Sequence, residues 1–149
     1  MPDALTGPGV FTWNGVRYKT ILSPTETGGA MSIVDSWSPA GFGPPRHVHE
    51  AEDETFVLIE GSCDFWLEGK SFTCEPGESV FIPRGREHTF RASAGEPSRH
   101  LVIFTPGGFE NFFVEMVREQ FRIPDDMERI NEAALRHNMR FTGPPLGVE

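Results

Sequence analysis

The sequence predicts a mainly β protein in which short antiparallel strands form a sandwich or a closed barrel, followed by helices. The chain has 149 residues, which suits one domain. Its 16 glycines and 13 prolines are more than a helical bundle tolerates, because glycine loosens helices and proline breaks them. Between about residues 11 and 105, β-rich runs alternate with Gly/Pro turns, and from about residue 109 the apolar spacing changes to three and four.

Charge and composition exclude several kinds of partner. The net charge is -9, whereas nucleic acids and anionic membranes need a basic surface. No apolar run approaches the roughly 20 residues of a membrane-spanning helix. Met1 to Leu5 lack the basic and apolar regions of a signal peptide, and two cysteines are too few for a disulfide scaffold. We therefore expect a cytoplasmic protein that acts on a small molecule.

The first strands follow from a turn and an alternation. The pair Asn14-Gly15 supplies the two positive φ angles of a type I′ turn, which predicts a hairpin. Over residues 31–37, one face of the next strand is mostly apolar and consists of Met31, Ile33, Asp35 and Trp37. Further strands are predicted at residues 55–60, 79–83, 88–90 and 99–105.

A second hairpin can be predicted in register. If Glu68-Gly69 form a two-residue turn, three cross-strand pairs follow: Cys63–Cys74, Asp64–Thr73 and Phe65–Phe72. The cysteine and phenylalanine pairs then share one apolar face, and a slip of one residue would mix the faces. The two cysteines are expected to be buried reduced thiols, with a redox switch as the alternative.

Helices are predicted at residues 109–121 and 125–138, where apolar residues repeat at three and four. Asp125 is the expected N-cap of the second helix, with Glu128 completing a capping box. Both helices should pack on the outside of the barrel, and a Gly/Pro tail follows them.

Four residues have the chemistry of metal ligands: His47, His49, Glu54 and His88. On an extended strand, His47 and His49 point to one face. A turn over residues 50–53 would return Glu54 to the same interior, and His88 opens a strand after the turn at residues 83–85. Three imidazoles and one carboxylate suit one divalent iron, manganese, nickel, copper, cobalt or zinc ion and leave positions open for water, substrate or dioxygen.

The spacing around these residues resembles a known pattern. Gly41-x5-His47-x-His49-x4-Glu54-x6-Gly61 resembles the first motif of the cupin superfamily, and Gly77-x5-Pro83-x-Gly85-x2-His88 resembles the second. Ala92 departs from the pattern, since the family usually carries Asn there, at a position that is not a ligand. The motif glycines occupy predicted turns where a side chain would clash.

The resemblance implies a single cupin domain over residues 1–149. A jelly-roll antiparallel β-barrel would cover about residues 10–106, and a helical extension would cover about residues 109–149. The metal would bind inside the barrel through His47, His49, Glu54 and His88. Members of this superfamily commonly pair through short edge strands, which implies a homodimer.

The C-terminal region extends the likeness. Residues 104–113 and 143–146 look like the C-terminal segment of quercetin-dioxygenase-like cupins. That resemblance implies a metal-dependent, dioxygenase-like enzyme for an enolisable hydroxyketone or phenolic substrate, with Glu54 as a base toward a substrate hydroxyl or as a ligand only. The alternatives are an isomerase, decarboxylase or lyase that uses no dioxygen, and a non-catalytic ligand-binding cupin.

Other residues near the motifs have two interpretations. Four arginines could pair with an acidic substrate or carry solvated charges on the rim: Arg46, Arg84, Arg86 and Arg91. His100 is expected to be a hydrogen-bonded core or rim histidine rather than a fifth ligand, and His137 is expected to be exposed. Five phenylalanines could line a substrate cavity or form the core: Phe56, Phe65, Phe72, Phe81 and Phe90.

Overall fold

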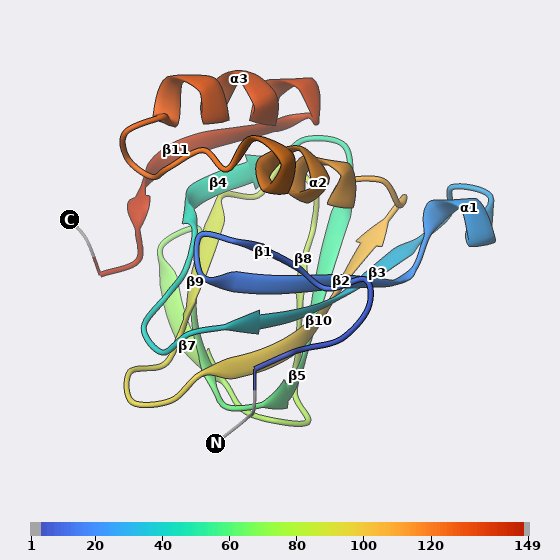
Figure 1. The fold of residues 1–149 in the computed structure, drawn as a ribbon. Helices are drawn as coiled ribbons and strands as arrows, with labels where there is room; N and C mark the ends of the chain where they lie inside the picture. The colour runs from blue at the N-terminus through green and yellow to red at the C-terminus, as the bar shows by residue number, and fades with distance from the viewer. Residues whose placement is uncertain (1–3, 148–149) are drawn as a thin grey trace.

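Two antiparallel sheets face each other in the computed structural model, which describes residues 4–147 (Figure 1). The six-stranded sheet has the order β1 (Phe11–Trp13), β2 (Val16–Leu22), β3 (Ser32–Ser38), β10 (Ser98–Thr105), β5 (Asp53–Glu60) and β8 (Ser79–Ile82). The five-stranded sheet has the order β11 (Met139–Pro145), β4 (Pro45–His49), β9 (His88–Ala92), β6 (Cys63–Leu67) and β7 (Lys70–Cys74).

The strand order is that of a jelly roll. In the six-stranded sheet β10 lies between β3 and β5, so segments far apart in the sequence are hydrogen-bonded neighbours. The mainly β jelly-roll prediction is confirmed. The expected closed barrel is not confirmed, because each sheet keeps two edge strands and the two sheets do not join into one continuous ladder.

Both predicted hairpins are confirmed in register. Asn14 and Gly15 have φ angles of 54° and 81°, and Phe11 pairs with Tyr18. The turn at Glu68-Gly69 produces the three cross-strand pairs predicted from the sequence. Cys63 and Cys74 are therefore neighbours, and both are buried free thiols. Burial raises the pKa of the Cys63 thiol to about 11, which keeps it protonated and unreactive.

Strand β3 forms where predicted, but its apolar face does not point into the core. Ser32, Val34, Ser36 and Ser38 are buried, whereas Ile33 and Trp37 are half-buried on the outer face. The interior needs small side chains at this strand, because Ser32 hydrogen-bonds Glu110 at 2.5 Å and Ser36 lines a cavity.

The C-terminal helices α2 (Glu110–Glu119) and α3 (Met127–Arg136) lie over one end of the two sheets, while α1 (Pro24–Thr27) lies to one side (Figure 1). The apolar faces of α2 and α3 are buried, as the periodicity predicted. The predicted cap is wrong: α3 begins after Asp126 instead of Asp125, with no side-chain cap. Asp126 instead accepts a hydrogen bond from the backbone N–H of Arg122 and closes the preceding loop. None of the described helices is long and apolar enough to cross a lipid bilayer.

The predicted Gly/Pro tail is a strand. β11 pairs with β4, so that Met139 lies opposite His49 and Phe141 opposite His47. Prolines are tolerated here because β11 is an edge strand whose outer side needs no N–H donors. This pairing places the C-terminal segment beside the two histidines of the first motif.

Two details of the core differ from expectation. Phe72 and Phe81 are 39% and 56% exposed, so they line neither the core nor a cavity. Of the motif glycines, Gly61 meets the expected clash, since a Cβ there would lie 2.2 Å from the carbonyl oxygen of Pro97. The other three have open space around them and are favoured instead by positive φ angles.

Candidate metal centre

The four candidate ligands come from both sheets. His47 and His49 lie on β4 and His88 on β9 of the five-stranded sheet, where His47 pairs directly with His88. Glu54 lies on β5 of the other sheet. The chain crosses between sheets after His49, which resets the strand alternation and lets Glu54 face the histidines, as the predicted turn over residues 50–53 required.

Their ligand atoms converge. One donor atom from each of the four side chains lies within 4.8 Å of the other three, and all four residues are buried. Glu54 Oε1 is 2.9 Å from His88 Nε2 and 3.6 Å from His49 Nε2. Two donors on one first-row ion lie up to about 4 Å apart, because each metal–nitrogen bond is about 2 Å long. The donor types fit a single divalent ion, and donors as far apart as 4.8 Å would have to close by about 0.8 Å when the ion binds.

Backbone and side-chain partners orient the rings. His47 Nδ1 lies 2.7 Å from the carbonyl oxygen of Pro45, and His88 Nδ1 lies 3.0 Å from that of Arg86. A proton on each Nδ1 would be donated to these carbonyls, which leaves Nε2 of both rings for the centre of the cluster. His49 Nδ1 faces a buried carboxylate, Glu52 Oε2, at 3.8 Å.

The electrostatics suit metal binding. Burial, together with the neighbouring imidazoles, holds the pKa of His47 well below its usual range, so the ring is a neutral ligand. Burial alone would raise the pKa of Glu54, but His49 and the hydrogen bond from His88 lower it to about 2. Burial alone would lower the pKa of His49, but the neighbouring Glu54 carboxylate outweighs this effect, so that the pKa of His49 lies above its usual value. Glu54 is thus a carboxylate at neutral pH.

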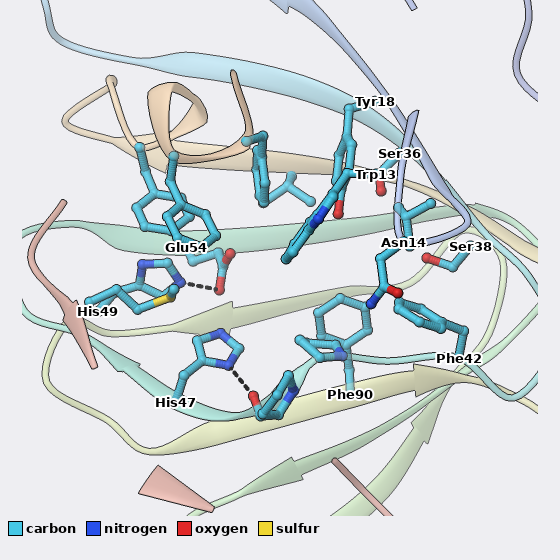
Figure 2. Close-up of a pocket in the computed structure, with 18 of the residues that line it drawn as sticks. Trp13, Asn14, Tyr18, Ser36, Ser38, Phe42, His47, His49, Glu54 and Phe90 are labelled. Carbon is cyan, nitrogen blue, oxygen red and sulfur yellow. Dashed lines mark hydrogen bonds and ion pairs between the residues drawn. The ribbon is translucent and has the colours of Figure 1, made fainter. Parts of the chain in front are cut away.

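An elongated cavity opens beside the cluster. Figure 2 shows His47, His49 and Glu54 at one end, Asn14, Ser36 and Ser38 at the other, and Trp13, Tyr18 and Phe90 between them. The cavity is small, because the centres of water-sized molecules can occupy only about 80 Å³ of it. Its walls are mostly apolar, which favours a small ligand with an aromatic or aliphatic body.

Segments outside the two motifs build much of the wall. Phe109, Phe112 and Phe113 at the start of α2 line the cavity, as do Met139 and Phe141 of β11. The expectation that the helices only pack outside is therefore incomplete, because α2 also closes one side of the cavity. Apolar periodicity predicted that these residues are buried, but it could not indicate that they line a cavity.

The four arginines do not line the cavity. Three form ion pairs, namely Arg84 with Asp53, Arg86 with Glu68 and Arg91 with Asp64. The guanidinium of Arg46 lies 4.0 Å from the centre of the Trp66 ring. This arrangement favours the interpretation as rim charges over a role in holding an acidic substrate.

Sequence reasoning missed one buried polar residue, Glu52, and the cavity-lining position of another, His100. Glu52 is 5% exposed and faces His49, but its place in a polar run predicted only a turn. His100 was expected to be hydrogen-bonded, yet it lines the cavity and neither ring nitrogen bonds a protein group among residues 4–147. His137 is half-buried rather than exposed and contacts Glu115.

Comparison with known proteins agrees with this geometry. A family model described as a cupin domain matches residues 36–104, which carry both motifs and all four clustered side chains. The part of the chain that carries the candidate metal centre is a cupin domain. This cupin is 28% identical over 96 residues to quercetin 2,3-dioxygenase of Bacillus subtilis (strain 168), a match that covers 64% of this chain and 28% of that protein.

A second relative is shorter. The cupin is 26% identical over 93 residues to the tetracenomycin polyketide synthase protein TcmJ of Streptomyces glaucescens, and the match covers 62% of each chain. Both matches thus span less than two thirds of the relative's own length.

Solved structures share the fold. KdgF from Halomonas sp. has a TM-score of 0.59 at 20% identity, covering 66% of this cupin and 86% of that chain. The polyketide cyclase RemF from Streptomyces resistomycificus has a TM-score of 0.55 at 24% identity, covering 68% and 70%.

Proposed function

We propose that this cupin binds one divalent transition metal through His47, His49, Glu54 and His88 and acts as a metal-dependent enzyme on a small molecule. The proposed reaction is dioxygenase-like, on an enolisable hydroxyketone or a phenolic substrate. The observation that carries the proposal is the convergence of four buried donor atoms at one end of an apolar cavity. The likeness to quercetin 2,3-dioxygenase supports the reaction class.

The chain's own residues would bind, orient and shield the substrate. When bound, the metal supplies a Lewis acid that lowers the pKa of a coordinated hydroxyl. The Glu54 carboxylate lies within the cluster, where it can accept the proton of that hydroxyl as well as act as a ligand. The apolar walls exclude water and give an aromatic ring a surface to pack on. Phe109 lies against His49 with ring centroids 4.4 Å apart and keeps that imidazole in place.

The second candidate is an isomerase, decarboxylase or lyase that uses no dioxygen. It is favoured by the similarity to the polyketide cyclase RemF, because closing a ring by an aldol reaction needs an enol or enolate and no oxidant. The same donor set would serve both reaction classes. A non-catalytic binding role is less well supported, because all four donors of the cluster are present.

One experiment separates these functions. Protein purified without a histidine tag is analysed for metal, and oxygen uptake is measured with quercetin as the probe. We expect about one transition-metal ion per chain and oxygen consumption that Glu54→Gln abolishes. Glu50→Gln is the matched control, because Glu50 is exposed and bonds Arg140 on the surface.

The outcomes differ clearly. Protein that takes up no transition metal would refute the metal-dependent function. Equal turnover of the probe with and without oxygen would transfer the proposal to the isomerase, decarboxylase or lyase class. Zinc as the bound ion would favour that class too, because zinc has no redox chemistry.

We also propose that the chain forms a homodimer in the cytoplasm. The outer face of the six-stranded sheet exposes Ile59 on β5 and Phe81 on edge strand β8, which supports an interface there. Light scattering after size exclusion should give twice the chain mass of 16.6 kDa. Phe81→Glu should reduce that mass to one chain, and an unchanged dimer would place the interface elsewhere.

A further inference from the structure

His100 is a buried polar residue that has no hydrogen-bond partner among residues 4–147. It lies on β10, is 1% exposed and lines the cavity, and neither Nδ1 nor Nε2 bonds a protein group within the described residues. Phe56 and Phe90 hold its ring on two sides, each with a centroid distance of 5.4 Å. A buried imidazole in native proteins normally has a hydrogen-bond partner. The partner of His100 must therefore come from the cavity itself.

Other polar groups lie at the same level of the sheet. Across neighbouring strands, His100 pairs with Ser36 on β3, and Ser36 pairs with Tyr18 on β2. All three residues line the cavity. Paired residues of adjacent antiparallel strands have Cβ atoms about 5 Å apart, so the imidazole and the Ser36 hydroxyl can reach one ligand atom together.

The imidazole is neutral in this environment. Burial lowers the pKa of His100 to about 4, well below the ordinary value of 6.5. A neutral ring offers one N–H donor and one nitrogen acceptor. The Ser36 hydroxyl can donate or accept. This pair therefore fits a hydroxyl or carbonyl oxygen better than a charged group.

This polar pair lies far from the metal centre. Phe104, four residues from His100 along β10, pairs with Glu54 on β5. At about 3.3 Å per residue, the backbone positions of His100 and Phe104 are about 13 Å apart along the strand. Apolar side chains fill the interval, with Phe56 and Val102 on the floor. In Figure 2, the Trp13 side chain lies between Glu54 and Ser36.

We propose that His100 and Ser36 form a distal subsite that hydrogen-bonds a second oxygen on the substrate. The ligand is then an elongated aromatic molecule with a chelating oxygen pair at the metal centre and a hydroxyl or carbonyl at its opposite end. This inference rests on the proposed metal-dependent function, and it narrows the substrate class. His100 is a specificity-determining residue here, because a ligand without the distal oxygen would leave a buried imidazole unpaired.

A matched pair of ligands tests the subsite. The probes are 3,4′-dihydroxyflavone and 3-hydroxyflavone, which share the chelating end and differ in one distal hydroxyl. Calorimetric titration uses protein loaded with zinc, so that no redox turnover consumes the ligand. We expect wild-type protein to bind the dihydroxy compound about tenfold more tightly or better, as one buried hydrogen bond implies. His100→Leu should bind both compounds equally and with the weaker affinity.

A stability measurement separates this role from a structural one. His100→Leu should keep or raise the melting temperature of the metal-free protein, because the imidazole makes no hydrogen bond to the part of the chain that the structure describes. His137→Leu is the matched control, since His137 bonds Glu115 and lies outside the cavity. It should leave the ligand preference unchanged.

Three results would overturn the subsite. They are equal binding of the two flavones by wild-type protein, an undiminished preference in His100→Leu, and a fall of about 5 °C or more in the melting temperature of that variant. Each of these leaves the metal centre intact. Failure of zinc-loaded protein to bind either flavone would overturn the chelating function together with the subsite.

Discussion

At the scale of single residues, the environment of each polar group decides its role more than its identity does. Glu54 and Glu52 lie two positions apart and are both buried. Glu54 faces three histidines and joins the donor cluster, whereas Glu52 faces only His49 from behind. The first is a candidate ligand and the second a candidate positioning residue.

Glu52 is predicted to tune metal affinity without binding the ion. Glu52→Leu removes the carboxylate that faces His49 Nδ1, and loss of such an outer partner weakens metal binding about 10–100-fold. Competition titration with a chromogenic chelator measures the change. Glu50→Leu, at an exposed neighbouring position, should bind metal normally. Equal affinity of both variants would show that Glu52 does not orient His49.

His100 is predicted to make the metal-free protein sensitive to acid. Its pKa is about 4 in the folded chain, against 6.5 for an exposed histidine. Between these pH values the unfolded chain takes up a proton that the folded chain does not, so stability is full above pH 6.5 and falls as the pH drops toward 4. Between pH 6.5 and pH 4, the free energy of unfolding of the wild-type protein should fall by up to about 3 kcal/mol more than that of His100→Leu. Urea unfolding at several pH values in this range measures both free energies. An equal fall in the two proteins would contradict the prediction.

At the scale of elements, turns and strand pairings carry the site. The crossing from β4 to β5 brings Glu54 to the histidines, and β11 covers the strand that carries His47 and His49. The loop before β4 must also pass close to β9. There, a Cβ on Gly43 would lie 1.8 Å from the carbonyl oxygen of Phe90.

Gly43 and Gly41 form a matched pair for this loop. Gly43→Ala should destabilise the protein by about 3 kcal/mol or more, because backbone atoms of β9 would have to move. Gly41→Ala should cost about 1 kcal/mol, since its surroundings are open and only its positive φ of 74° opposes a side chain. Chemical denaturation of the two variants tests the difference. Equal losses would mean that backbone conformation rather than steric contact governs the loop.

At the scale of the whole molecule, the candidate metal centre lies between two sheets that share no ladder. Its donors come from β4 and β9 on one side and from β5 on the other. An ion bound there links the two halves of the jelly roll. A ligand that binds only the folded state also stabilises that state by mass action.

Metal binding is therefore predicted to raise the stability of the entire fold. At a free metal concentration of 100 times Kd, the free energy of unfolding rises by about 2.7 kcal/mol. Thermal unfolding should shift upward on addition of metal and return on addition of a chelator, and Glu54→Gln should show a smaller shift. A melting temperature that does not respond to any first-row divalent ion would favour the non-catalytic interpretation.

Features that depend on local chemistry and short spacing could be predicted from the amino-acid sequence alone. Turn residues such as Asn14-Gly15 and Glu68-Gly69 set hairpin registers, because few residues accept positive φ angles. The two motifs identified the jelly roll and the four residues that the fold brings together. Periodicity located both C-terminal helices to within a few residues.

The faces and segments that enclose the cavity became known from the folded structure. The serines of β3 point inward, the Gly/Pro tail becomes β11, and His100 lies unpaired beside an apolar space. None of these follows from local pattern, because each depends on what packs against the residue from a distant part of the chain. A strand has two faces, and the elements that pack against it determine which face is buried and which faces solvent.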